Sequence, residues 1–179
     1  MSGYPPPAPS ARYRAQRAYV ATMFALLGRL LVAGSAADPE IARELADFPE
    51  GCSLGFSILG DATSLRLVCR GGRLFAAPGA GKPDIEIVFK HLAHAFALLT
   101  FQESTPVAYA RDRMSTHGDI ALTMRLVRCL TRVQAVMLPT ALARRALKSL
   151  PEQPVLARLG LATRIAGELA RGLLARSSR

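Results

Sequence analysis

The sequence predicts an α+β domain in which helices pack on one face of a mainly antiparallel sheet. Between residues 52 and 90, apolar and polar side chains alternate in four short segments, which is typical of strands with one buried face. Apolar residues recur every three or four positions in 11–33 and 120–138, which indicates helices before and after the strands. At 179 residues, half of them apolar, the chain is long enough for one domain with a substantial core.

The chain is expected to begin with an unstructured tail followed by two helices. Residues 1–10 read MSGYPPPAPS and are rich in proline. A helix is predicted over 11–33, and a short second helix over 39–48, with Pro39 in its first turn.

The four strands are predicted at 52–59, 64–70, 73–77 and 84–90. The pair Gly71-Gly72 suits a tight hairpin turn between the second and third strands. In the last strand, apolar residues alternate with Asp84, Glu86 and Lys90, so one face is again expected to be buried.

Helical spacing returns after the strands. Helices are predicted at 91–101, 105–111 and 120–138, and a brief strand at 114–116 precedes the last of them. Gly118 permits a sharp turn, and Asp119 is well placed to cap the N-terminus of the helix that follows. Two further helices are expected at 140–150 and 155–176, separated by prolines. The predicted organisation is a tail (1–10), N-terminal helices (11–49), a core (50–138) and C-terminal helices (139–179).

The positive charge lies at the two ends of the chain. Residues 1–17 carry three basic and no acidic side chains, residues 18–110 carry seven basic and nine acidic ones, and residues 111–179 carry thirteen basic and four acidic ones. This asymmetry favours an anionic partner, either phospholipid headgroups or nucleic acid, although basic residues can also simply keep an apolar protein soluble. Aromatic residues make up only 6% of the chain and tryptophan is absent, so no specific nucleic-acid site is expected.

The cysteines predict a reducing compartment. Cys52, Cys69 and Cys129 are odd in number and form no CxxC pair, so we expect buried, reduced thiols in a cytoplasmic protein. The apolar stretch 18–28 follows three arginines and resembles a signal peptide, but Arg29 interrupts it and disfavours both a leader and a spanning helix.

No pattern of catalytic or metal-binding residues is recognisable. The stretch GAGK at 79–82 lacks the first glycine and the final Ser or Thr of a phosphate loop. His91 and His94 are three apart on a predicted helix, but no acidic or thiol partner is close in sequence. We therefore expect no enzyme, no metal site and no cofactor.

Residues 84–130 carry a resemblance to a known family. An aspartate-led strand (Asp84) is followed by LLT at 98–100, the helix Pro106 to Tyr109, the pair Gly118-Asp119 and ALTMRL at 121–126. In order and spacing this resembles the sterol carrier protein 2 family, over roughly residues 50–138. The tail beyond 139, with its LP-x-x-L motif, is similar to the bacterial ubiquinone-biosynthesis accessory proteins of that superfamily. Phe101 stands where the family has glycine, and the strand at 114–117 is more polar than usual.

The resemblance implies a five-stranded, mainly antiparallel sheet with an apolar tunnel between sheet and helices, which takes a sterol, a fatty acyl chain or a prenyl or quinone-type lipid. On that resemblance the lipid contacts are Phe89, Phe96, Leu99, Tyr109, Leu122, Leu126 and Leu130, each of which is equally well explained as ordinary core.

The basic helices suggest where such a protein meets a membrane. Arg125, Arg128 and Arg132 cluster on one side of helix 120–138, and Arg164 and Arg171 lie opposite the apolar side of the last helix. Basic amphipathic helices suit the headgroup region of a bilayer, so we expect docking through these five arginines. The C-terminal helices can equally pack on the core or on another subunit, and the number of subunits stays open.

The leading hypothesis is thus a non-enzymatic lipid carrier that is cytoplasmic and peripherally membrane-associated. The alternative is an interaction module with a closed core, whose basic ends bind a partner enzyme or nucleic acid.

Overall fold

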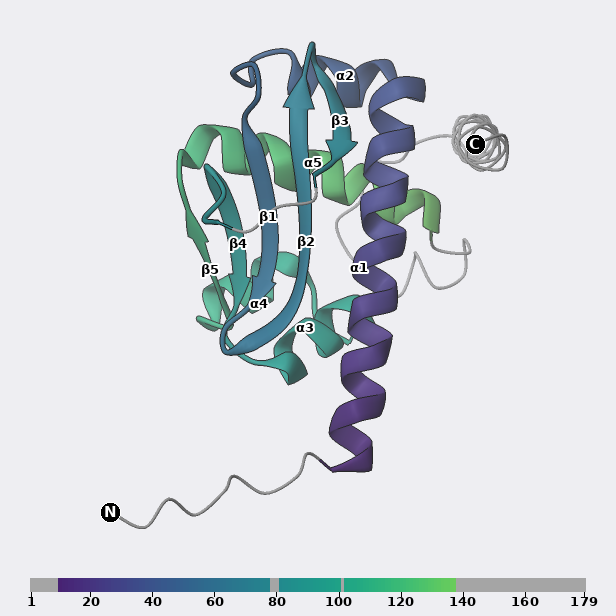
Figure 1. Cartoon of the computed structure of the whole chain (residues 1–179), viewed down its shortest axis with the longest axis vertical. Coiled ribbons are helices and arrows are strands. Elements are labelled where there is room, and N and C mark those ends of the chain that lie inside the picture. The colour runs from purple at the N-terminus through teal and green to yellow at the C-terminus, as the bar shows by residue number, and fades with distance from the viewer. Residues whose placement is uncertain (1–9, 78–80, 101, 138–179) are drawn as a thin grey trace.

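The computed structural model describes residues 10–77, 81–100 and 102–137, which form five helices and five strands (Figure 1). The helices are α1 (Ala11–Ala37), α2 (Pro39–Leu45), α3 (Leu92–Leu99), α4 (Thr105–Ala110) and α5 (Ile120–Met137). The strands are β1 (Ser53–Ile58), β2 (Asp61–Arg70), β3 (Arg73–Ala76), β4 (Ile85–Phe89) and β5 (Met114–His117). The predicted α+β class is confirmed, and every element predicted within the described residues is present.

The five strands form one mixed sheet in the order β3-β2-β1-β4-β5. Three neighbouring pairs are antiparallel, whereas β1 and β4 run parallel. Gly71 and Gly72 both have positive φ, 54° and 68°, as the predicted tight turn between β2 and β3 requires. The chain then crosses the sheet to place β4 on the far side of β1.

Pro83, at the end of this connection, lies on the outer face of the sheet, away from the helices. Pro83 is buried there over Gly55 of β1, and a Cβ on Gly55 would come within 2.6 Å of the Pro83 ring. A glycine at this position therefore allows the connection to lie flat on the strand.

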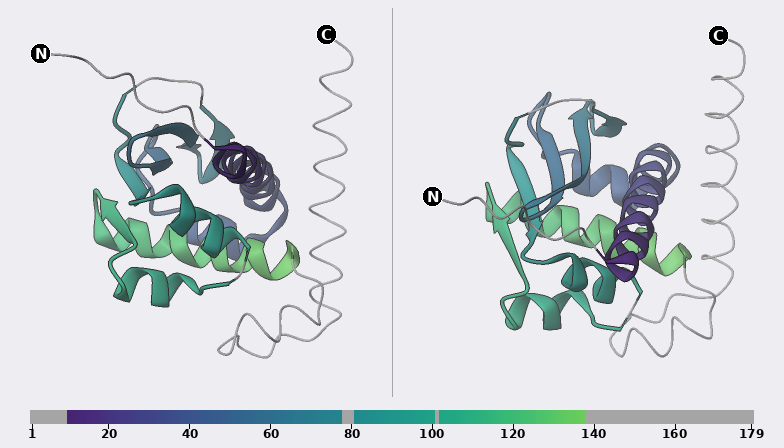
Figure 2. Two further views of the ribbon diagram at one scale, coloured as in Figure 1. Left: turned by 90° about the horizontal axis from the view of Figure 1, so that it is seen from below. Right: turned by 60° about the horizontal axis from the view of Figure 1, so that its bottom comes forward.

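The helices cover the opposite face, where α5 runs behind the strands and α3 and α4 lie below it in the view of Figure 1. The two turned views in Figure 2 show α5 and the long α1 together on this side of the sheet. The inward side chains of all five strands and the apolar sides of α1, α3 and α5 form one buried cluster. This arrangement is the one-sided cover that period-two alternation predicts.

Helix α1 packs closely on the sheet at the β2 and β3 end. A Cβ on Gly28 would come within 2.6 Å of the Leu65 side chain, so this glycine allows the close approach of helix and strand. The hydroxyl of Ser35, which is 3% exposed, accepts a 3.0 Å hydrogen bond from the backbone N–H of Leu74 in β3. Because β3 is an edge strand, this contact satisfies a donor that would otherwise be buried without a partner.

By length and composition, α1 is the one described helix that could cross a membrane, with a mean hydropathy of 1.7 over its most apolar window. Half of that window is buried inside the protein, against the sheet and the other helices.

The Gly-Asp corner between β5 and α5 forms as predicted. Gly118 has φ 99°, and the side chain of Asp119 accepts a 2.9 Å hydrogen bond from the backbone N–H of Leu122. Asp119 is thus the N-cap of α5. The segments 1–9 and 138–179, including the helices predicted at 140–150 and 155–176, lie outside the described residues.

Candidate functional site

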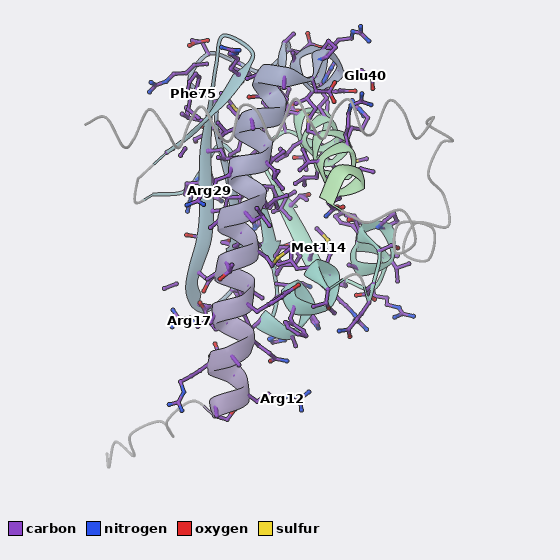
Figure 3. The ribbon with its side chains drawn as sticks, turned by 90° about the vertical axis from the view of Figure 1, so that its right-hand side faces the viewer. Arg12, Arg17, Arg29, Glu40, Phe75 and Met114 are labelled. Carbon is purple, nitrogen blue, oxygen red and sulfur yellow. The ribbon has the colours of Figure 1, made fainter. Side chains whose placement is uncertain are left out.

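The layer between the sheet and the helices is mainly apolar over the described residues, with Ser35, Thr63 and Thr123 as buried polar side chains. At its centre, the ring of Phe24 in α1 lies between those of Phe56 in β1 and Phe89 in β4, with centroids 6.4 and 6.2 Å apart. Met114 of β5, labelled in Figure 3, also points into this layer and is 5% exposed. Most contacts available to a molecule placed here are apolar, so the layer suits a hydrocarbon better than a polar group.

Six of the seven side chains predicted to contact lipid lie in or against this layer. Phe89, Leu99, Leu126 and Leu130 are buried members of the core, and Phe96 and Leu122 are partly buried and pack against it. They come from β4, α3 and α5, which the fold brings together from positions up to 41 residues apart (89 to 130).

Tyr109 lies apart from the other six. It is on α4 and is 57% exposed, whereas its neighbour Ala108 is the buried residue of that helix. The helical period turns consecutive residues about 100° apart, so a six-residue helix that buries Ala108 directs Tyr109 outward.

The apolar layer reaches the protein surface between α1 and α3. Tyr19 and Phe96 meet edge to face with centroids 5.2 Å apart, and Tyr19 is 37% exposed. On the same helix as Tyr19, Met23 is partly buried and Leu26 is 39% exposed. We call these four residues the α1–α3 margin: Tyr19 contacts Phe96 of α3, and Met23 and Leu26 continue the same side of α1 at helical spacing, so apolar side chains lead from the interior layer to solvent.

The arginines of α5 that were predicted to dock on membranes form ion pairs that hold α5 to α2 and its flanking residues. Arg128 makes two hydrogen bonds of 2.8 Å to the carboxylate of Glu44, and Arg125 approaches the same carboxylate at 3.4 Å. Arg125 also pairs with Asp47.

The third arginine, Arg132, pairs with Asp38 and Glu40. Asp38 is only 1% exposed and also caps α2 by accepting a 2.9 Å hydrogen bond from the backbone N–H of Glu40. A buried carboxylate requires such a partner, because an unpaired buried charge is costly.

These contacts change the charge that α5 presents. The hydrogen bond from Arg128 lowers the pKa of Glu44 below its usual value, despite an opposing effect of burial, so the carboxylate stays ionised. The three arginines thus face four carboxylates, and their side of α5 is neutralised rather than cationic. Sequence inspection missed the pairing because nothing in the local pattern of 120–138 shows that α2 lies beside it. Arg164 and Arg171 lie outside the described residues.

The three cysteines are buried and reduced, as predicted. Burial raises the pKa of Cys129 to about 12 and that of Cys52 to about 11, and it also raises the pKa of Cys69. These thiols stay protonated at neutral pH and are poor nucleophiles.

In the part of the chain that the structure describes, the histidines belong to no cluster of metal ligands. His91 and His94 lie with ring centroids 5.1 Å apart, and the described residues contain no group of three or more His, Cys, Asp or Glu side chains suited to a metal ion.

A carboxylate joins the first turns of α1 to the β1–β2 turn. Asp61 accepts hydrogen bonds from the Tyr13 hydroxyl at 2.9 Å, the Arg17 side chain at 3.0 Å and the Thr63 backbone N–H at 2.7 Å. Burial alone would raise the pKa of Asp61, but the hydrogen bonds from Thr63, Tyr13 and Arg17 outweigh it and lower the pKa to about 2. Of the three basic residues at the start of α1, Arg17 is thus already paired.

No family model and no curated protein matches this chain. Among solved structures, it is similar to the ubiquinone synthesis protein UbiJ-SCP2, with 19% identity, a TM-score of 0.43, and coverage of 66% of this chain and 98% of that one. It is also similar to sterol carrier protein 2 like 2 from Aedes aegypti, with 15% identity, a TM-score of 0.39, and coverage of 64% and 96%. Domain 2 of the Helicoverpa armigera sterol carrier protein has 15% identity, a TM-score of 0.39, and coverage of 72% and 91%. These similar structures come from the family that the sequence resembles.

Proposed function

We propose that this protein is a non-enzymatic lipid carrier that holds one apolar molecule, of the sterol, fatty acyl or prenyl-quinone class, between the sheet and the helices. The observation that carries the proposal is the α1–α3 margin, where an otherwise buried apolar layer continues to the surface through Tyr19, Met23, Leu26 and Phe96. The ordered motifs of residues 84–130, which resemble a lipid-binding family, support the same function.

Uptake requires α1 and α3 to separate at this margin. Over the described residues the interior side chains pack against one another, so a ligand replaces contacts between protein groups with contacts to itself. Each square ångström of ligand surface that leaves water contributes about 25 cal/mol, which is the driving force for loading. Among the described residues, the hydrogen bond that must break between α1 and α3 is the 3.4 Å one from the Tyr19 hydroxyl to the Leu99 carbonyl.

Loading is proposed to occur at anionic membranes in the cytoplasm, with the protein bound peripherally. Since Arg125, Arg128 and Arg132 are paired with α2, the attraction must come from other residues. Arg12 and Arg14 are exposed on α1 and form no ion pair within the described part of the chain, and Arg164 and Arg171 add to them in sequence. Each basic residue close to an anionic surface contributes on the order of 1 kcal/mol.

The ligand is identified first by native mass spectrometry of gently purified protein, which should show one bound lipid. Binding is then measured by the fluorescence of cis-parinaric acid. Phe96→Asp places a charge in the α1–α3 margin and should weaken binding by at least about tenfold, since a buried unpaired charge costs several kcal/mol. Tyr109→Asp is the matched control, because that residue is exposed on α4 and should leave affinity unchanged. Equal effects of both variants, with folding verified by circular dichroism, would refute the interior site.

Membrane docking is tested separately by co-sedimentation with vesicles. Binding should rise with the phosphatidylglycerol fraction and fall between 50 and 300 mM salt, because exposed charges are screened. If binding depends neither on the phosphatidylglycerol fraction nor on the salt concentration, membrane docking is refuted, whereas the carrier function is not.

The close packing of the described interior favours one alternative: an interaction module with a closed core, which binds a partner enzyme or nucleic acid through its basic ends. In that case the protein carries no lipid and cis-parinaric acid does not bind. Filter binding of mixed-sequence DNA at two salt concentrations then distinguishes a nucleic-acid partner from a protein partner.

A further inference from the structure

A hollow lies on the outer face of the sheet, opposite to the helices. It is a cavity of about 490 Å³ over β2 and β3, closed on one side by residues 81–83 of the crossover. Its volume lies within the range of small-molecule sites, which is about 300–1,000 Å³. Its lining includes Arg66, Val68 and Arg70 of β2, Phe75 of β3 and Lys82.

The floor of this outer cavity is apolar. Val68 and Phe75 are direct cross-strand partners on β2 and β3, and Phe75 is 45% exposed. Figure 3 shows Phe75 on the sheet side of the molecule, pointing away from the helices. An aromatic ring left half open to solvent beside a concave wall offers a surface on which a flat apolar group can stack.

The rim of the cavity is cationic. Arg66 and Arg70 flank Val68 on the same face of β2, about 13 Å apart along the strand, and Lys82 projects from the crossover. No acidic side chain is among the lining residues. Arg66 lies 3.9 Å from Glu86, which also accepts a 2.8 Å hydrogen bond from Ser57, so this arginine is partly neutralised. Arg70 and Lys82 form no ion pair within residues 10–77, 81–100 and 102–137.

We propose that this outer cavity binds an organic anion that has an apolar body and a carboxylate or phosphate group. The body stacks on Phe75 and Val68, and the anionic group is held by Arg70 and Lys82. A guanidinium and an ammonium from two different segments make charge-assisted hydrogen bonds to such a group, which are about twice as strong as neutral ones. The site is separate from the proposed lipid interior, since the sheet itself lies between them, and it does not rest on the lipid-carrier function.

The test uses 1-naphthyl phosphate as the probe, with 1-naphthol and inorganic phosphate as single-feature controls. Titration of the full-length, isotope-labelled protein by NMR should give saturable shifts of backbone signals in 66–77 and 81–83, with weaker binding of both controls. The double variant Arg70→Glu/Lys82→Glu should lose at least about tenfold in affinity, which corresponds to about 1.4 kcal/mol. Arg29→Glu/Arg43→Glu changes the net charge equally, at exposed positions on α1 and α2, and should bind the probe as the wild type does.

Three results would overturn the proposal. Shifts confined to α1, α3 and α5 would place the probe in the interior layer. Equal loss of affinity in both double variants would show non-specific attraction to net charge. Sedimentation with phosphatidylglycerol vesicles that depends on Arg70 and Lys82, without binding of the soluble probe, would assign these residues to a membrane surface instead. A Phe75→Ser variant tests the apolar half of the site. It should weaken the binding of 1-naphthyl phosphate and leave the binding of inorganic phosphate unchanged.

Discussion

The corner at Gly118 offers a sharp test of how the β5–α5 connection holds the sheet and helix together. In Gly118→Ala, the new Cβ would lie 2.1 Å from the carbonyl oxygen of Asp84 at the start of β4, a distance that no real contact reaches. The same variant forces alanine to φ 99°. A positive φ costs an L-residue about 1–2 kcal/mol, and forcing extra atoms into a packed site costs about 1–3 kcal/mol more. We therefore expect the free energy of unfolding to fall by about 2–5 kcal/mol.

The matched control is Gly60→Ala in the β1–β2 turn. Gly60 has φ 75°, but nothing lies within 4 Å of the Cβ that alanine would add there. In this variant only the cost of the positive φ applies, so the free energy of unfolding should fall by about 1–2 kcal/mol. Both values come from equilibrium urea unfolding followed by far-UV circular dichroism, with the m-value checked for constancy. If the two variants lose equal stability, the close approach of Gly118 to Asp84 is not a constraint and the reasoning fails.

Three further predictions concern the frame around the candidate sites. Ser35→Ala leaves the N–H of Leu74 buried without an acceptor and should lower the free energy of unfolding by about 1–3 kcal/mol in urea titrations; a loss within error of zero would contradict the edge-capping role. Because the pKa of Asp61 is about 2, below its usual 3.8, its ionised form stabilises the fold above pH 3.8, and that contribution disappears as the pH falls towards 2. Asp61→Asn should therefore be less stable than the wild type by about 2 kcal/mol at pH 7 and equal to it near pH 2, whereas a difference independent of pH would refute the assignment. Cys129, with a pKa of about 12, should resist Ellman's reagent in the native protein and react after unfolding in urea.

Much of the fold could be predicted because its signals are local. The Gly71-Gly72 turn, the alternation in 84–90 and the capping of α5 by Asp119 each depend on a few adjacent residues. Helix α1 extends four residues beyond its predicted end at 33, as far as Ala37, because Asp38 there ends one helix and caps the next. Boundaries of this kind depend on side-chain geometry, which a hydrophobic pattern does not carry.

The candidate sites were less accessible to sequence reasoning. The arginines at 125, 128 and 132 read as a cationic face because their partners in α2 and its N-cap are 81 to 94 residues away in the sequence. Tyr109 matched a family pattern, yet the turn of a six-residue helix places it in solvent. Arg70, Phe75 and Lys82 were not singled out, although the outward positions of β2 alternate between basic and apolar residues at 66, 68 and 70. That alternation is the sequence pattern from which the outer cavity could have been predicted.

By itself, the sequence determined which segments are strands and helices, where the chain turns, and which side of each element is apolar, since these depend on propensity and on periods of two and 3.6 residues. Only the tertiary structure decided that β4 lies beside β1 in parallel, that α2 neutralises α5, and that a basic hollow forms under the crossover. Each of these depends on contacts between segments far apart in the chain. Such contacts form only when the sheet and helices pack around a common core.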